Sequence, residues 1–222
     1  PDRTVYLCFG HDEELGGVNG AIAIVEHLKN TKVQAEFVLD EGFAISQGLI
    51  LGIDKDVAMI GTSEKGFVTF NLNLELEGGH SSMPKKESVI DVLSKAIVRL
   101  KENPFESKIT EPINDFIQYL GPEMPFMQKM AFANPTIFKS LIVSSYEKKP
   151  SGNALMRTTT APTIMNAGIK DNVIPYQATA TVNFRTLPGT SIEDVRQHIL
   201  EVIEDDRIVL TEGDFSCAAP RA

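Results

Sequence analysis

The chain has 222 residues, of which 42% are hydrophobic and 23% are charged, as in a globular protein that buries a sizeable core. A net charge of −9 and the lack of a basic stripe exclude a protein that binds nucleic acid through its phosphates. The longest uncharged apolar stretch, residues 43–53, is about half as long as a membrane span, so we expect no membrane segment.

The two ends of the sequence predict an internal fragment of a longer protein. The chain begins without Met or a signal segment and enters an apolar run at Val5 almost at once. It closes on residues 215–220, which show neither helix nor strand periodicity. Such ends leave the compartment of the protein open.

Residues 1–63 have the pattern of part of an α/β domain. Apolar strands are predicted over 4–9, 36–39 and 57–60, and a helix over 18–28. Continuous apolar strands separated by helices are typical of a parallel sheet that is covered on both faces.

Residues 64–213 have the pattern of a ferredoxin-like α+β domain. From Gly66 apolar and polar side chains alternate, as in an antiparallel strand with one wet face. The order strand, helix, strand, strand, helix, strand follows over 67–77, 89–100, 158–168, 177–185, 190–203 and 207–211. Prolines interrupt residues 103–155, which predicts short helices broken by loops. Residues 214–222 would return to the first domain.

Acidic residues follow two of the predicted parallel strands. The turn 10–17 contains Glu13 and Glu14, and Asp40 and Glu41 follow the next strand. Loops at the carboxyl ends of parallel strands are where α/β proteins bind ligands. One carboxylate could bind a cation while its neighbour accepts a proton from a metal-bound water. The alternative for each cluster is a solvated acidic turn.

Polar residues of the second domain are further candidates. His80 stands in a Gly-rich loop and belongs to no apolar face. Arg185 lies on the polar face of its strand, where its planar guanidinium suits a carboxylate. The alternative for Arg185 is a surface ion pair. Asn172 opens an Asn-Val-Ile-Pro segment ahead of the same strand.

Several motifs occur together in one order along the chain. They are Gly-His-Asp-Glu-Glu-x-Gly-Gly, Leu-Asp-Glu-Gly, Glu-Gly-Gly-His-Ser-Ser-x-Pro, Asn-Val-Ile-Pro and Asn-Phe-Arg-x-x-Pro-Gly. This set resembles the zinc-dependent aminoacylase/carboxypeptidase family of metallopeptidases. Residues 157–168 resemble its Gly-Xaa carboxypeptidase and N-acyl-amino-acid hydrolase branch. The resemblance implies a parallel-sheet zinc-peptidase catalytic domain, of which 1–63 are a part, and a lid and dimerisation domain over 64–213.

The resemblance assigns the acidic residues to a metal centre. Glu13 matches the general base of the family and Glu14 the neighbouring zinc ligand. Asp40 matches the next ligand in this branch, while Glu41 is the one assigned in aminoacylase relatives and stays open as an alternative. Two zinc ions per site are implied for the full-length enzyme, with cobalt or manganese as possible substitutes.

The resemblance also assigns the residues of the second domain. His80 matches the lid histidine that helps to polarise the scissile carbonyl, often in the active site of the dimer partner. Arg185 and Asn172 match positions that hold the free carboxylate of the substrate. A homodimer through the lid domain is therefore expected.

The expected function is a metal-dependent hydrolase that cleaves the amide bond of N-acyl amino acids or removes C-terminal residues from small peptides. Further metal ligands of the family lie upstream and downstream of its matching segments, and this chain does not contain them. A catalytic zinc keeps about three protein ligands, so we expect the metal site of the chain to be incomplete. The alternative is a non-catalytic dimerisation or binding module, or an inactive relative of the same fold.

Overall fold

The computed structural model describes residues 2–40, 44–48, 50, 53–214, 216–217 and 219. The chain forms two compact units, Pro1–Gly42 and Phe43–Ala222. The mixed fold of helices and strands that the sequence predicts is confirmed. The division predicted after residue 63 stays a prediction.

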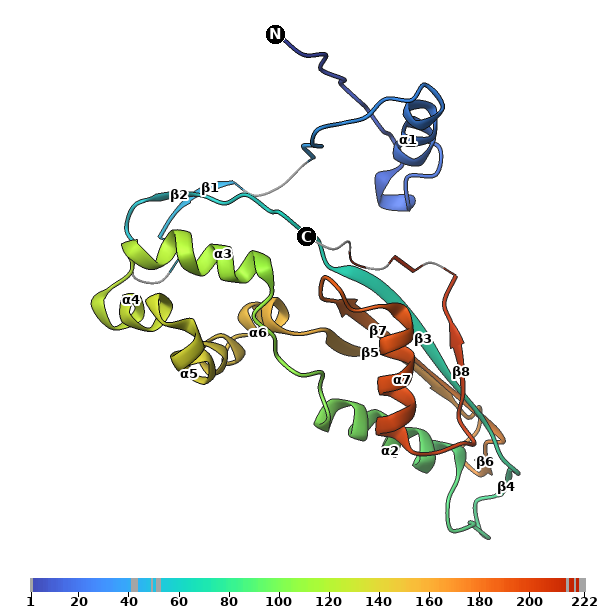
Figure 1. Ribbon diagram of the computed structural model, residues 1–222. Coiled ribbons are helices and arrows are strands. Elements are labelled where there is room, and N and C mark those ends of the chain that lie inside the picture. The colour runs from blue at the N-terminus through green and yellow to red at the C-terminus, as the bar shows by residue number, and fades with distance from the viewer. Residues whose placement is uncertain are drawn as a thin grey trace. The chain divides into compact units, whose positions relative to one another are not determined.

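The elements follow one another in this order. The first unit contains η1 (Glu13–Leu15) and α1 (Ala21–Asn30). The second unit begins with β1 (Ile45–Gln47), β2 (Asp56–Ala58), β3 (Gly66–Glu75), β4 (Gly79–His80) and α2 (Val89–Glu102). It continues with α3 (Glu111–Leu120), η2 (Gly121–Glu123), α4 (Phe126–Ala133), α5 (Pro135–Glu147) and α6 (Pro150–Met156). It ends with β5 (Thr159–Ala167), β6 (Val173–Ile174), β7 (Gln177–Thr186), α7 (Ile192–Ile203) and β8 (Val209–Glu212) (Figure 1).

The main sheet of the second unit has the strand order β5-β7-β3-β8. β3 and β7 pair antiparallel along their whole length, from Gly66 opposite Thr186 to Glu75 opposite Gln177. β5 pairs with β7, and β8 pairs with β3, both antiparallel. With α2 after β3 and α7 after β7, this is the ferredoxin-like arrangement that the alternation of the sequence predicts.

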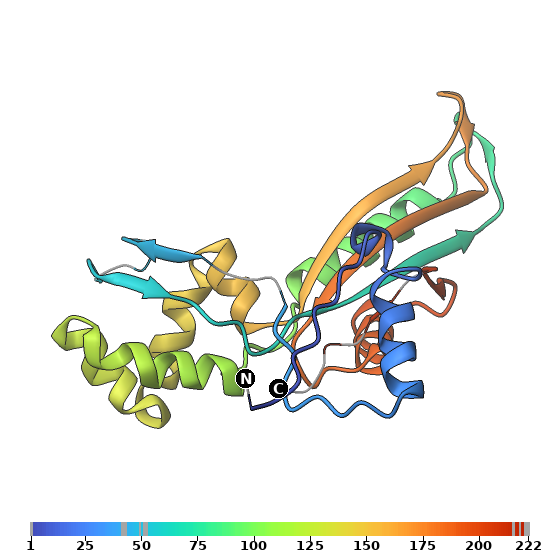
Figure 2. The same ribbon diagram turned by 90° about the horizontal axis from the view of Figure 1, so that it is seen from above.

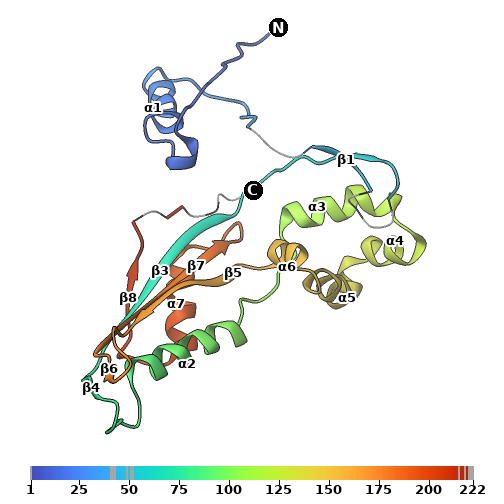
Figure 3. The ribbon, with the colours of Figure 1, turned by 180° about the vertical axis from the view of Figure 1, so that it is seen from behind.

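The core lies between this sheet and the helices α2 and α7, which lie on one face of it (Figure 1, Figure 3). Its members include Val68, Phe70, Leu72 and Leu74 of β3, Ala178, Ala180, Val182 and Phe184 of β7, Val92 and Leu93 of α2, and Val195 and Ile199 of α7. Both helices begin at a serine that forms a reciprocal capping box with the aspartate three residues later, in the first turn. The inward-facing residues are those that the period-two and helical patterns predict.

The helices α3 to α6 form a second apolar cluster within the same unit. Its buried residues are Ile113, Ile117, Ala131, Ile142 and Met156. Pro135 and Pro150 each stand in the first turn of a helix, where a missing N–H costs nothing. The prediction of short helices over 103–155 is confirmed. Within the described ranges, each helix is too short or too polar to cross a bilayer.

The strands predicted over 4–9 and 36–39 are wrong. Both segments lack strand structure, and Leu7, Phe9 and Leu39 are 78%, 84% and 86% exposed. A strand persists only where a neighbour satisfies its backbone N–H and C=O groups, and none of the described strands pairs with either segment. The predicted helix of this unit does form, as α1.

The strand predicted over 57–60 forms as β2, but not in a parallel sheet. It pairs antiparallel with β1, with Ile45 opposite Ala58. Antiparallel strands can be joined by a short loop, whereas a parallel pair needs a crossover of a dozen or more residues. The described residues accordingly contain only antiparallel pairs.

Candidate active site

The first acidic turn is organised around Asp12. Its carboxylate Oδ2 accepts a hydrogen bond from the backbone N–H of Asn19 at 2.8 Å. Its carbonyl accepts from the N–H groups of Leu15 and Gly17 at 3.0 and 2.9 Å. These bonds fold the turn back on itself and present Glu13 and Glu14 on a single turn of 3₁₀ helix, where both are exposed.

Glycines make this turn possible. Gly16 and Gly17 have φ of 93° and 66°, in the left-handed region that side chains with a Cβ rarely enter. A Cβ on Gly20 would lie 2.5 Å from Oδ1 of Asp12, so a side chain there would displace the Asp12 carboxylate. The glycine-rich sequence around the two glutamates is therefore required by their local backbone.

The metal-ligand assignment stays a prediction. Glu14 and Asp40 are both exposed, and Glu41 lies outside the described residues. Among the residues that the structure describes, no three His, Cys, Asp or Glu side chains are arranged to hold a metal ion. Carboxylates are suitable ligands for a divalent cation, but Glu14 and Asp40 are fewer than the roughly three protein ligands of a catalytic zinc.

His80 lies at the tip of the second unit, where β4 pairs with β6 and His80 stands opposite Val173. The backbone N–H of Ser82 donates to Nδ1 of His80 at 3.2 Å, and Oγ of Ser82 lies 2.8 Å from the same nitrogen. A backbone N–H can only donate, so Nδ1 accepts and the neutral ring carries its proton on Nε2. The exposed side chain is thus prepared to donate a hydrogen bond through Nε2.

Asn172 lies beside His80. Its carbonyl accepts from the N–H of Ser81 at 3.1 Å, and its side-chain Oδ1 is buried without a hydrogen-bond partner among the described residues. Gly78 allows the backbones of β4 and β6 to approach closely here, because a Cβ at Gly78 would lie 2.7 Å from the carbonyl oxygen of Ile174. The structure therefore brings together two of the predicted site residues.

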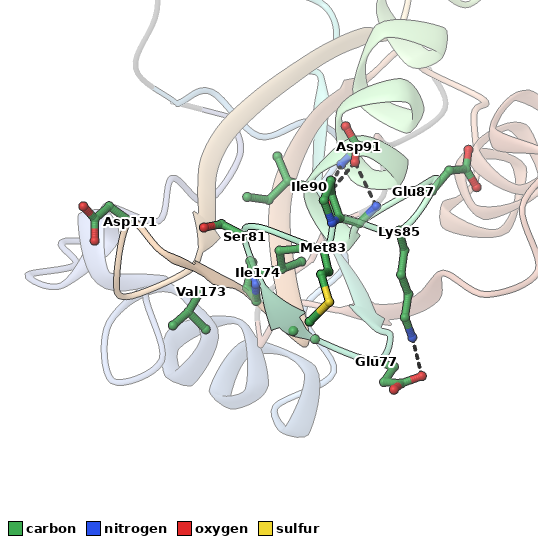
Figure 4. Close-up of a pocket in the computed structure, with 15 residues that line it drawn as sticks. Glu77, Ser81, Met83, Lys85, Glu87, Ile90, Asp91, Asp171, Val173 and Ile174 are labelled. Carbon is green, nitrogen blue, oxygen red and sulfur yellow. Dashed lines mark hydrogen bonds and ion pairs between the residues drawn. The ribbon is translucent and has the colours of Figure 1, made fainter.

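A cavity of about 260 Å³ lies between this tip and the start of α2 (Figure 4). Lys85 and Glu77 form an ion pair at its edge, and Met83 and Ile174 are among the apolar side chains that line it. The pair lowers the pKa of the Glu77 carboxyl, chiefly through the hydrogen bond from Lys85. The cavity has a mixed lining and does not include the His80 ring.

Arg185 lies at the other end of the sheet. It stands opposite Phe67 of β3, and its guanidinium carbon lies 4.7 Å from the centre of the Phe67 ring. Arg185 is exposed and forms no ion pair with a described residue, so the surface ion pair considered as an alternative does not form in the described part of the chain. Its in-plane N–H groups are free of hydrogen bonds to described residues.

His80 and Arg185 are far apart within one chain. Phe67 lies opposite Arg185, and Glu75, at the end of β3 that leads to β4, follows Phe67 by eight positions. At about 3.3 Å per residue this is roughly 25 Å or more. The tip formed by β4 and β6 also lies away from the helices α3 to α6 (Figure 1, Figure 2). Within a single copy, a small substrate therefore cannot place its scissile bond at His80 and its carboxylate at Arg185 at the same time.

Comparison with known proteins identifies the family. A model described as the M20 peptidase dimerisation domain matches residues 62–208. The chain belongs to this family. The match confirms the resemblance on which the site residues were assigned, and it covers the M20 dimerisation domain that contains His80, Asn172 and Arg185.

Relatives of this M20 chain extend the similarity over nearly all of it. It is 42% identical to a probable carboxypeptidase S-like protein from Dictyostelium discoideum, over 96% of this chain and 41% of the relative. It is 43% identical to an N-fatty-acyl-amino acid synthase/hydrolase from Xenopus tropicalis, over 95% of this chain and 41% of the relative. The solved structure of human carnosine dipeptidase 1 matches 72% of this chain and 38% of its own, with a TM-score of 0.45 and 11% identity. The chain thus spans about two fifths of the length of these relatives.

Two residues that shape the site were missed by the sequence patterns. The sequence pattern places Asp12 in an acidic turn, as an N-cap at most, whereas the structure shows three backbone N–H groups donating to it. The sequence pattern gives Ser82 no role, whereas the structure shows it orienting the ring of His80. A signal for Ser82 exists, since a Ser two residues after a His can reach Nδ1 with its backbone N–H in a tight turn.

Proposed function

We propose that the protein to which this chain belongs hydrolyses the amide bond of N-acyl amino acids, or removes C-terminal residues from small peptides. The observation that carries the proposal is the match to the M20 dimerisation domain together with relatives named as carboxypeptidases and N-fatty-acyl-amino acid hydrolases. These relatives are similar along nearly the whole chain, including the first acidic turn.

Zinc is the metal that we propose for this reaction. Membership of the M20 family implies a divalent metal. Glu14 and Asp40 would supply two of its ligands, and the others would come from parts of the protein outside this chain. When bound, the metal would supply Lewis-acid polarisation of the amide carbonyl.

Glu13 is the proposed proton acceptor. It would take a proton from the water that attacks the amide carbonyl and later return it to the leaving nitrogen. Its place beside Glu14 on the turn held by Asp12 supports different roles for the two carboxylates, because neighbouring side chains on this turn point in different directions. One can bind the cation while the other stays available for the proton.

His80 would act in the site of a second copy of the chain. The roughly 25 Å between the two ends of the sheet supports this arrangement. A dimer could place His80 and Asn172 of one copy near Arg185 of the other. Nε2 of His80 would then donate to the oxyanion of the tetrahedral intermediate, and Arg185 would hold the carboxylate of the substrate.

A second candidate function is a dimerisation module without catalysis. It is favoured by the incomplete ligand set, since the described residues gather no site of three ligands. Under this alternative, the chain would dimerise but the protein that contains it would hydrolyse no amide.

The test is an assay of the full-length protein against N-acyl amino acids and dipeptides, before and after removal of metal by a chelator. Hydrolysis that is lost with the metal and restored by zinc is expected. A folded, metal-loaded dimer that cleaves neither class of substrate would contradict the proposal and favour the dimerisation module.

A further inference from the structure

Lys65 is a half-buried cation without a counter-ion among the described residues. It directly precedes β3, and its ammonium donates to the carbonyl oxygens of Ala154 and Arg157 at 2.8 and 2.9 Å. Both acceptors lie at the end of α6, where the helix dipole favours a positive charge. Two of the three ammonium protons are used in this way, and one is left.

Arg185 lies near Lys65, because Phe67, two residues after Lys65, is its partner across the sheet. Its guanidinium carbon lies 4.7 Å from the centre of the Phe67 ring, a cation–π contact that leaves its N–H groups unused by described residues. The chain carries nine more acidic than basic residues, yet neither cation has a carboxylate within ion-pair distance in the described part of it.

Two unpaired cations at one end of a sheet repel one another. Burial, the larger cause, and the charge of Arg185 together lower the pKa of Lys65 to about 8. An anion that touches both groups would remove the repulsion and offset the loss of hydration. The two groups would hold such an anion better than either does alone, since a guanidinium binds it bidentately and an ammonium adds a point charge.

We propose that Lys65 is a second substrate-binding residue, which together with Arg185 holds the carboxylate of the N-acyl amino acid. This inference rests on the proposed function, in which Arg185 binds that carboxylate. A shift in the position of α6 would then also change substrate binding, because carbonyls at the end of that helix hold the same ammonium.

The simpler alternative is that Lys65 only anchors α6. An anchor would affect all substrates equally, whereas a carboxylate-binding residue distinguishes an acid from its amide. The first experiment therefore compares the best N-acyl amino acid substrate of the full-length protein with its primary amide. The variants are Lys65→Met, Lys65→Arg and Arg185→Ala, with the exposed Lys101→Met as the matched control.

Lys65→Met is expected to raise KM for the acid about tenfold with kcat nearly unchanged, and to leave KM for the amide within about twofold. Lys65→Arg should recover part of the loss, and Lys101→Met should behave as wild type. Equal effects on acid and amide, or no effect, would leave Lys65 as an anchor only. If Arg185→Ala abolishes the preference for the acid while Lys65→Met keeps it, the inference on Lys65 fails and the proposed function stands. If the wild-type protein hydrolyses neither the N-acyl amino acid nor its primary amide, the proposed function itself fails.

A second measurement needs no change at Lys65, in case Lys65→Met does not fold. Acetylation of individual lysines by acetic anhydride is followed by mass spectrometry in full-length Glu13→Gln protein, which should bind substrate without consuming it. The N-acyl amino acid is expected to slow acetylation of Lys65 several-fold, while its amide does not and Lys101 reacts at a constant rate. An acetylation rate of Lys65 that is the same with both ligands as without them would overturn the inference.

Discussion

At the scale of single residues, Glu13 and Glu14 are neighbours with different proposed roles. Glu13→Gln removes a proton acceptor but no metal ligand, so we expect normal metal content and a loss of turnover of at least ~10³-fold in the full-length protein. Glu14→Gln is the matched control and should lose metal. Metal content by atomic absorption, measured beside the rate, checks both. Loss of metal in Glu13→Gln with retention in Glu14→Gln would show that the two roles are reversed.

His198 links stability to pH. Its ring is stacked on Phe105, with 3.8 Å between ring centres, and Nε2 lies 3.0 Å from the carbonyl oxygen of Asn103. Burial, the largest cause, lowers its pKa below the usual 6.5 despite opposing effects of Asn103 and Glu201. The unfolded chain therefore binds the proton more readily, and stability is lost as the pH falls below about 6.5.

We expect His198→Phe, which keeps the stacked ring, to lose less stability than wild type between pH 7 and pH 5. Urea unfolding midpoints at the two pH values measure the difference. The exposed His27→Gln should follow wild type. An identical pH dependence in His198→Phe and wild type would show that this ring does not contribute to it.

At the scale of elements, the β4–β6 pair holds His80 through the backbone of Gly78. A Cβ at Gly78 would lie 2.7 Å from the carbonyl oxygen of Ile174, whereas a Cβ at Gly79 would meet nothing within 4 Å. Gly78→Ala should therefore push the strands apart and reduce turnover by about 10-fold or more, while Gly79→Ala stays near wild type. Steady-state kinetics of the two full-length variants are the measurement. Equal rates would mean that this pairing does not position His80.

At the scale of the whole molecule, the separation of His80 and Arg185 predicts an active site shared between two copies. Full-length His80→Ala should lose about 10²–10³-fold in turnover, as expected when one oxyanion donor is removed. Mixing it with inactive Glu13→Gln should restore activity, because one site of each mixed dimer receives both intact residues. With random exchange about a quarter of wild-type activity is expected. No recovery after subunit exchange has been verified would place His80 in the site of its own chain or outside catalysis.

Some of this molecule is determined by the sequence alone. The alternation along β3 and β7 identifies both strands and their buried faces, because the direction of successive side chains is a local property of extended backbone. The serine and aspartate of each capping box likewise mark the starts of α2 and α7. The ordered motifs around Glu13, His80 and Arg185 point to the family that the matched domain then confirms.

Other features were decided only by the tertiary structure. The apolar segments 4–9 and 36–39 read as strands, but a strand needs hydrogen-bonding neighbours, and the described residues contain none for them. The register of β3 against β7 and of β4 against β6 places Asn172 beside His80 and leaves Arg185 at the opposite end. The half-burial of Lys65 depends on a helix some 90 residues away in sequence, at Ala154 and Arg157. Pairing and burial join residues that are distant along the chain, so no local pattern can specify them.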